Sequence, residues 1–87
     1  MSYNLNVHVV DLHEFEDIYK ALEFLETEIY RLYKNGDQFV RVIHGVGEGI
    51  LKEKVHGALK NNPLIIQFEL EKTDGSTIVY LDRSRQC

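Results

Sequence analysis

The chain passes from a strand pattern to a helix pattern within one stretch, Ile43-His44-Gly45-Val46-Gly47-Glu48-Gly49-Ile50-Leu51-Lys52. We call residues 44–49 the glycine turn. Its three glycines stand at alternate positions, which lets the backbone bend tightly and expose its N–H groups. A helix that begins directly after the turn adds partial positive charge. The stretch therefore predicts a site for a phosphate oxygen, with a histidine at its entrance that can move a proton.

The residues on either side of the glycine turn predict the element order β-α-β-α-β-β. Runs of β-branched and alternating apolar residues indicate strands, and apolar residues at steps of three and four indicate helices. Asp17 is expected to cap the first helix, and Asn35-Gly36 to end it. The predicted ranges are strands at 5–12, 38–43, 64–70 and 77–81, and helices at 17–34 and 50–60.

This order predicts an α/β fold of the α+β kind. Two strand-helix-strand units favour parallel pairing, and a closing hairpin at Asp74-Gly75 makes the last strand antiparallel. We expect a two-layer sandwich, in which both helices cover one face of a four-stranded mixed sheet. The length of 87 residues predicts a single domain over residues 1–87.

Composition excludes several classes of protein. A chain that is 44% hydrophobic and 28% charged is typical of soluble globular proteins, and it holds no apolar segment long enough to cross a bilayer. The one cysteine, Cys87, excludes an internal disulfide and a cysteine-based zinc site. We expect no membrane partner and a cytoplasmic location.

Charge is distributed unevenly along the chain. The net charge of −4 argues against a protein that grips nucleic acid through bulk positive charge. However, residues 1–37 hold eight acidic and three basic residues, a net −5, whereas residues 38–87 have a net charge of +1. Lys52, His56 and Lys60 follow one another at steps of four, which predicts one exposed stripe along the second helix. Together with Arg41, this stripe is expected to contact phosphates.

Residues that can carry chemistry follow two of the predicted strands. Asp11 and His13 end the first strand, and His44 follows the second. Ligands collect at the carboxyl ends of parallel strands, and the two-residue period places Asp11 and His13 on the same side of the chain. We expect Asp11 to orient His13, and His44 with the amides of the glycine turn to face the same space.

Such a site suits cleavage of a phosphodiester bond. One histidine takes a proton from the attacking group, the other protonates the leaving oxygen, and backbone amides stabilise the developing charge. A second route is open, in which Asp11 and the histidines hold a divalent ion, Mg²⁺ or Mn²⁺, that activates water. Purely structural roles are a third: a tight turn, hydrogen-bonded strand-end histidines and a solvated helix face.

Two motifs resemble those of the Smr (small MutS-related) domain family. The family has a strand that ends in Leu-Asp-x-His, here Val10-Asp11-Leu12-His13, and a His-Gly-x-Gly turn that opens a helix, here the glycine turn. The resemblance implies the fold of the C-terminal domain of translation initiation factor three, DNA or RNA as partner, and weak nicking endonuclease activity. The functional residues that it implies are Asp11, His13, His44, Gly45 and Gly47. Gly49 completes the proposed phosphate-binding turn.

One departure from the family pattern favours other functions. Glycine usually follows the histidine of the first motif, but this chain has Glu14, then Phe15, Glu16 and Asp17. Three acidic residues beside a phosphate site repel a polyanion. The alternatives are a non-catalytic module that binds nucleic acid or the ribosome, and a module whose acidic first helix, with Glu23, Glu26 and Glu28, meets a basic protein.

Overall fold

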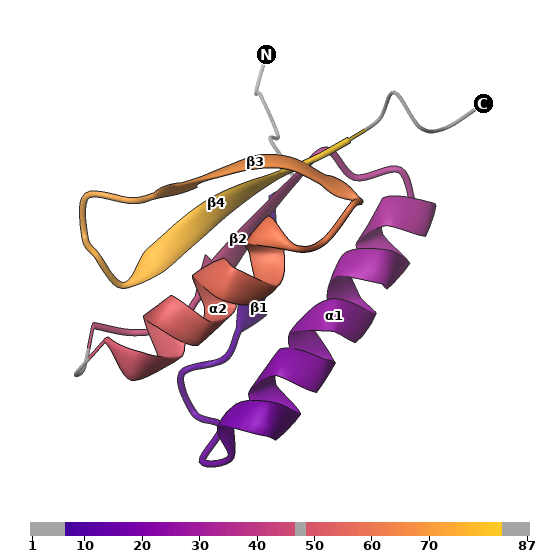
Figure 1. Cartoon of the computed structure of the whole chain (residues 1–87). Helices are drawn as coiled ribbons and strands as arrows, with labels where there is room; N and C mark the ends of the chain where they lie inside the picture. The colour runs from indigo at the N-terminus through magenta and orange to yellow at the C-terminus, as the bar shows by residue number, and fades with distance from the viewer. Residues whose placement is uncertain (1–6, 47–48, 83–87) are drawn as a thin grey trace.

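Two helices lie against a four-stranded sheet in the part of the chain that the computed structural model describes, residues 7–46 and 49–82 (Figure 1). The order β-α-β-α-β-β is the predicted one, and the bounds differ from the predicted ranges by a few residues at the ends. Leu5 and Asn6, which the first predicted strand included, lie outside the described residues. The elements are β1 (His8–Asp11), α1 (Ile18–Lys34), β2 (Phe39–Ile43), α2 (Ile50–Lys60), β3 (Ile65–Leu70) and β4 (Ser76–Leu81).

The strands lie in the order β1-β2-β4-β3. β1 and β2 are parallel, with Asp11 opposite Ile43, and β4 is antiparallel to both β2 and β3. The mixed sheet is therefore confirmed, but parallel pairing in the second strand-helix-strand unit is not: β2 and β3 are separated by β4. The tight turn at Asp74-Gly75, where Asp74 has a φ of 66°, leads the chain from β3 directly into β4, the strand between β2 and β3.

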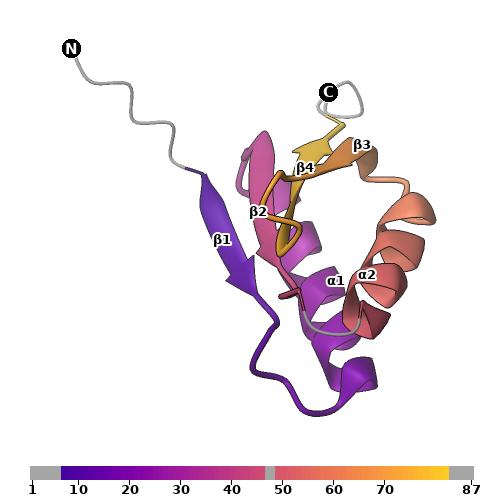
Figure 2. The ribbon, with the colours of Figure 1, turned by 90° about the vertical axis from the view of Figure 1, so that its left-hand side faces the viewer.

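Both helices cover the same face of the sheet, which confirms the two-layer sandwich (Figure 2). The strands supply this face through alternate residues: Val40 and Val42 are buried, and Arg41 between them points to the other face. A core this small depends on each of its side chains. The buried apolar residues are Val10, Leu12, Ala21, Leu25, Ile29, Leu32, Tyr33, Val40, Val42, Val55, Leu59, Val79 and Leu81.

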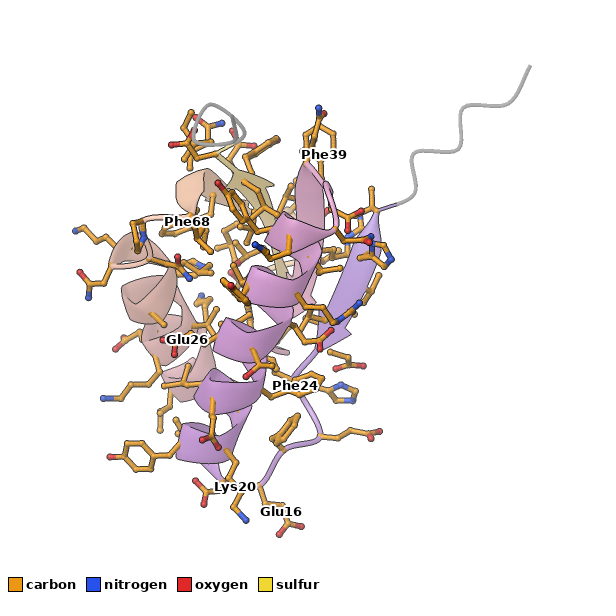
Figure 3. All side chains as sticks on the ribbon, turned by 90° about the vertical axis from the view of Figure 1, so that its right-hand side faces the viewer. Glu16, Lys20, Phe24, Glu26, Phe39 and Phe68 are labelled. Carbon is orange, nitrogen blue, oxygen red and sulfur yellow. The ribbon has the colours of Figure 1, made fainter. Side chains whose placement is uncertain are left out.

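The long helix α1 begins and ends where its local sequence predicts. The Asp17 carboxylate accepts hydrogen bonds from the backbone N–H groups of Tyr19 and Lys20, and the helix ends at Asn35 before Gly36, whose φ is 93°. The buried stripe of α1 consists of Ala21, Leu25, Ile29, Leu32 and Tyr33. Phe24 and Glu26, outside this stripe, point to opposite sides of the helix (Figure 3). No helix in residues 7–46 and 49–82 has the length and apolar character needed to cross a membrane.

Candidate functional site

The ends of β1 and β2 meet at one edge of the sheet, as predicted. The backbone N–H of Leu12 donates to the carbonyl of Ile43 at 2.7 Å, which continues the parallel pairing past the last pair of β1. A Cβ placed on Gly45 would lie 3.5 Å from the Cβ of His13. The motif at Asp11–His13 and the glycine turn are therefore neighbours, although His44 and Asp11 are 33 positions apart in the sequence.

Asp11 orients His13, which agrees with the two-residue period. Its Oδ1 accepts the backbone N–H of His13 at 3.0 Å and lies 2.5 Å from the ring Nδ1. This side-chain hydrogen bond, reinforced by the charge of Asp11, raises the pKa of His13, and the same bond lowers the pKa of Asp11. Since Nδ1–H donates to Asp11, the other nitrogen, Nε2, is directed away from it on a half-exposed side chain. The Glu14 carboxylate lies 3.9 Å from that Nε2.

Replacing Asp11 with asparagine should lower the pKa of His13. The neutral amide removes the charge that favours the imidazolium, so the ring loses its proton at lower pH than in the parent chain. Titration of the His13 ring protons by NMR measures this shift. Asp37→Asn is the matched control, because Asp37 contacts His8 at the far end of β1. An unchanged His13 titration in Asp11→Asn contradicts the orienting role.

His44 does not face the same space as His13, contrary to our expectation. Its side chain continues the inward alternation of Val40 and Val42 and is 4% exposed. Both ring nitrogens are engaged, Nδ1 with the carbonyl oxygen of Gly45 at 3.0 Å and Nε2 with Oγ1 of Thr77 at 2.9 Å. In this arrangement the ring nitrogen directed toward solvent belongs to His13, and His44 holds the turn.

The first amides of the glycine turn are also occupied. The N–H groups of His44 and Gly45 donate to the carbonyl of Gly75 at 3.0 and 2.9 Å, so they are directed at the β3–β4 turn rather than at a ligand. Gly45 and Gly49 have φ values of 82° and 84°, a region that suits glycine. Gly47, the other glycine predicted to bind phosphate, lies outside the described residues.

The amides best placed for an anion belong to the first turn of α2. Gly49 is the N-cap, and no side chain of a described residue caps this helix. The first N–H groups of an α-helix have no partner within the helix and carry its positive dipole end. They border a cavity of about 250 Å³, which is large enough for a phosphate group and is lined by Ile18, His44, Gly45, Val46, Gly49, Ile50, Leu51 and Lys52.

The prediction that Lys52, His56 and Lys60 form one continuous exposed stripe is wrong. Lys52 lies at the cavity but pairs with Asp74 at 3.1 Å, and His56 turns inward to bond Oγ1 of Thr77 at 2.8 Å. Only Lys60, in the last turn of α2, is fully on the solvent side. Of the three predicted phosphate contacts, Lys52 is thus neutralised by an acidic partner and His56 is turned toward the protein interior.

Arg41 lies away from the cavity, on the sheet face opposite the helices. Its guanidinium forms two hydrogen bonds with the Glu71 carboxylate, at 2.9 and 3.1 Å. Glu71 also accepts a hydrogen bond from the Ser76 hydroxyl, and these contacts lower its pKa, the serine first and Arg41 second. The expected contribution of Arg41 to the phosphate site is therefore not supported by its position.

The described side chains that could hold a metal ion do not come together at the site. No group of three or more His, Cys, Asp or Glu side chains comes together within the described ranges in a way that could hold a metal ion. Asp11 and His13 are in contact, but the ring of His44 is turned to the other side of the sheet. Among the described residues, these side chains therefore do not form the Mg²⁺ or Mn²⁺ site of the second route.

Three contributors to the site were missed in the sequence. Thr77 bonds two histidines, the Gly75 carbonyl holds the glycine turn, and Asp74 pairs with Lys52. Thr77 carried a signal, because positions 77, 79 and 81 alternate inward and only this one is polar. A buried hydroxyl needs hydrogen-bond partners.

Comparisons with known proteins agree on one family. A model described as the Smr domain matches residues 10–82. Two curated relatives, both called Endonuclease MutS2, are the protein of Thermomicrobium roseum, 35% identical over 80 residues, and that of Aquifex aeolicus, 38% identical over 71 residues. These matches cover 87% and 77% of this chain but 10% and 9% of the relatives, so the chain spans about a tenth of their length.

A solved structure agrees in fold. The crystal structure of the Smr domain of Thermus thermophilus MutS2 matches with a TM-score of 0.80 and 25% sequence identity. The match covers 87% of this chain and 99% of that one. The sandwich of two helices on a four-stranded mixed sheet is therefore shared with that domain.

Proposed function

This chain belongs to the Smr domain family, and from that premise we propose that it binds DNA or RNA at the glycine turn and cleaves the phosphodiester backbone weakly. The curated relatives are called endonucleases, which supports a role on nucleic acid. The activity of those much longer proteins is transferred to this chain only as part of the proposal.

One observation carries the proposal: Gly45 belongs to two features at once. It lines the cavity at the N-terminus of α2, and it lies against His13, whose ring is oriented by Asp11. His13 does not itself line the cavity, so a phosphate held by the first amides of α2 would meet its half-exposed ring across Gly45. Binding of the anion and transfer of a proton can therefore occur at one place.

The chemistry that we propose uses His13 as the acid. Its raised pKa keeps more of the ring protonated near neutral pH, so Nε2–H can donate to the leaving oxygen as the phosphorus–oxygen bond breaks. The attacking group is the 2′-hydroxyl of RNA or a water molecule, which loses its proton to solvent. The dipole of α2 and its first amides stabilise charge on the phosphate oxygens. Asp11 holds the ring and stabilises its charged form.

A specific observation favours a second candidate, a binding module without catalysis. The Glu14 carboxylate lies 3.9 Å from Nε2 of His13, the atom that would donate to a leaving oxygen. Like the net charge of −4, it opposes the approach of a polyanion. In that case the glycine turn and Lys60 contact the backbone, and no bond is broken.

Assays on the purified chain separate these functions. Cleavage is measured with Mg²⁺, with Mn²⁺ and with EDTA, and we expect nicked circles from supercoiled plasmid or fragments from RNA. Binding of labelled oligonucleotides is measured separately, and we expect it to weaken as salt is raised. Lys60→Ala should reduce the salt dependence by one phosphate contact, and Lys34→Ala in α1 is its control. Binding without cleavage supports the module, and the absence of both at low salt contradicts the proposal.

A further inference from the structure

A buried hydroxyl joins two histidines that come from different elements. Oγ1 of Thr77, on β4, lies 2.9 Å from Nε2 of His44 and 2.8 Å from Nε2 of His56, on α2. Thr77 is 0% exposed, and the two rings meet edge to face with centroids 5.8 Å apart. The ring of His56 also packs on that of Phe68, a residue of β3, with ring centroids 5.0 Å apart (Figure 3). The three polar groups therefore satisfy one another within the protein.

Counting hydrogens fixes the direction of each bond. The carbonyl oxygen of Gly45 can only accept, so Nδ1 of His44 carries a hydrogen and, in the neutral ring, Nε2 is an acceptor. The single hydroxyl hydrogen of Thr77 must then point to Nε2 of His44. Since that hydrogen is used, Nε2 of His56 must donate to Oγ1. The chain of donors runs from His56 through Thr77 and His44 to the Gly45 carbonyl.

We propose that Thr77 and His56 are positioning residues for the glycine turn, which act by holding His44 as the tautomer with its hydrogen on Nδ1. That hydrogen fixes the Gly45 carbonyl, while the N–H groups of His44 and Gly45 are fixed by Gly75. The backbone that forms one wall of the cavity is thereby tied to β4 and α2. The expected effect on nucleic-acid binding rests on the function proposed above. The tautomers of His44 and His56 do not depend on that function.

The same arrangement admits one positively charged ring at a time. If both rings were charged, each Nε2–H would point at Oγ1, and the hydroxyl hydrogen would lose its acceptor on His44 in a buried place. Charge acts in the same direction: burial first, then His44 and Lys52, lower the pKa of His56. Lys52, one turn earlier on α2, is itself paired with Asp74 from the β3–β4 turn. His56 should therefore take up a proton only at a lower pH than an ordinary histidine does.

Long-range proton–nitrogen NMR spectra of the histidine rings test the proposal on the intact chain. The expected result is a single tautomer for each ring, with hydrogen on Nδ1 of His44 and on Nε2 of His56. In Thr77→Val, a variant of nearly the same shape, His56 has no acceptor and should exchange between its two tautomers. Thr77→Ser supplies a hydroxyl again and should restore the single-tautomer spectra of His44 and His56. Thr27→Val, on the exposed side of α1, is the matched control.

A second variant keeps the test valid if Thr77→Val fails to fold. His56→Gln supplies an N–H donor to Thr77 and should preserve the His44 spectrum, whereas His56→Phe keeps only the ring, leaves the Thr77 hydroxyl without the donor that orients it, and should shift the Nε2 signal of His44. Oligonucleotide binding is measured on the same variants. It should weaken about fivefold in those that interrupt the hydrogen bonds from His56 through Thr77 to His44, as the loss of one buried hydrogen bond implies.

Two results overturn the proposal whatever the protein binds. One is a wild-type His44 with its hydrogen on Nε2, and the other is a His56 signature that Thr77→Val leaves unchanged. If the tautomers are as expected and change with Thr77 but no variant binds or cleaves nucleic acid differently, the positioning stands and the nucleic-acid function of the turn fails.

Discussion

Replacing His13 with alanine should lower the rate of phosphodiester cleavage by about 100- to 10,000-fold, the usual contribution of a positioned acid or base. His13 is oriented by Asp11 through Nδ1, and its Cβ lies beside Gly45, so Nε2 is the ring nitrogen that Asp11 does not occupy. His44 differs, because both of its ring nitrogens are already bonded within the protein. The loss in His13→Ala should therefore appear in the cleavage step, with nucleic-acid binding changed much less.

Single-turnover cleavage of a labelled substrate measures this effect separately from binding. His8→Ala is the matched control, because His8 is also on β1 and partly exposed but contacts Asp37 at the opposite end of the strand. Cleavage that persists unchanged in His13→Ala would mean that His13 does not act on the substrate. Activity that is equal in every variant points to a contaminating nuclease.

Replacing Ile29 with alanine should destabilise the fold by about 2–5 kcal/mol. Ile29 lies at the centre of the buried stripe of α1 and is 0% exposed. Removing three carbon atoms leaves a cavity that the surrounding side chains fill only in part. A small domain has about 5–15 kcal/mol of stability in total, so this one change removes a large part of it.

Urea unfolding followed by circular dichroism gives the free energy of unfolding for this comparison. Glu26→Ala, on the exposed side of the same helix, should change it by less than about 0.5 kcal/mol. If Ile29→Ala costs no more than this control, α1 is not packed on the sheet as described. The slope with urea should remain the same in all three proteins, since the surface exposed on unfolding is similar.

Local chemistry explains what was predicted at the site. Asp11 and His13 are two residues apart on a strand, and that spacing alone places them on one side, where they bond. The same rule applied to Val40, Val42 and His44 would have turned the His44 ring inward. The meeting of the strand ends favours a place beside His13, but the direction of the His44 side chain overrides it.

The partners of the charged residues could not be predicted in the same way. Arg41 bonds Glu71 and Lys52 bonds Asp74, across 30 and 22 residues of sequence. These pairs exist because β4 is inserted between β2 and β3, which brings the β3–β4 turn beside the glycine turn. Spacing along α2 suggested a stripe of free positive charge, but spacing carries no information about what packs against the helix.

The sequence by itself determined the order and type of the elements, the caps of α1, the buried stripe and the Asp11–His13 pair. All of these depend on residues within one or two turns of each other, where backbone geometry and apolar spacing are sufficient. Only the tertiary structure decided the place of β4 and the bond between His44 and Thr77, which are 33 residues apart. Contacts of that kind follow from how the sheet is ordered and how its covered face is packed, and burial then requires each polar group to find a partner there.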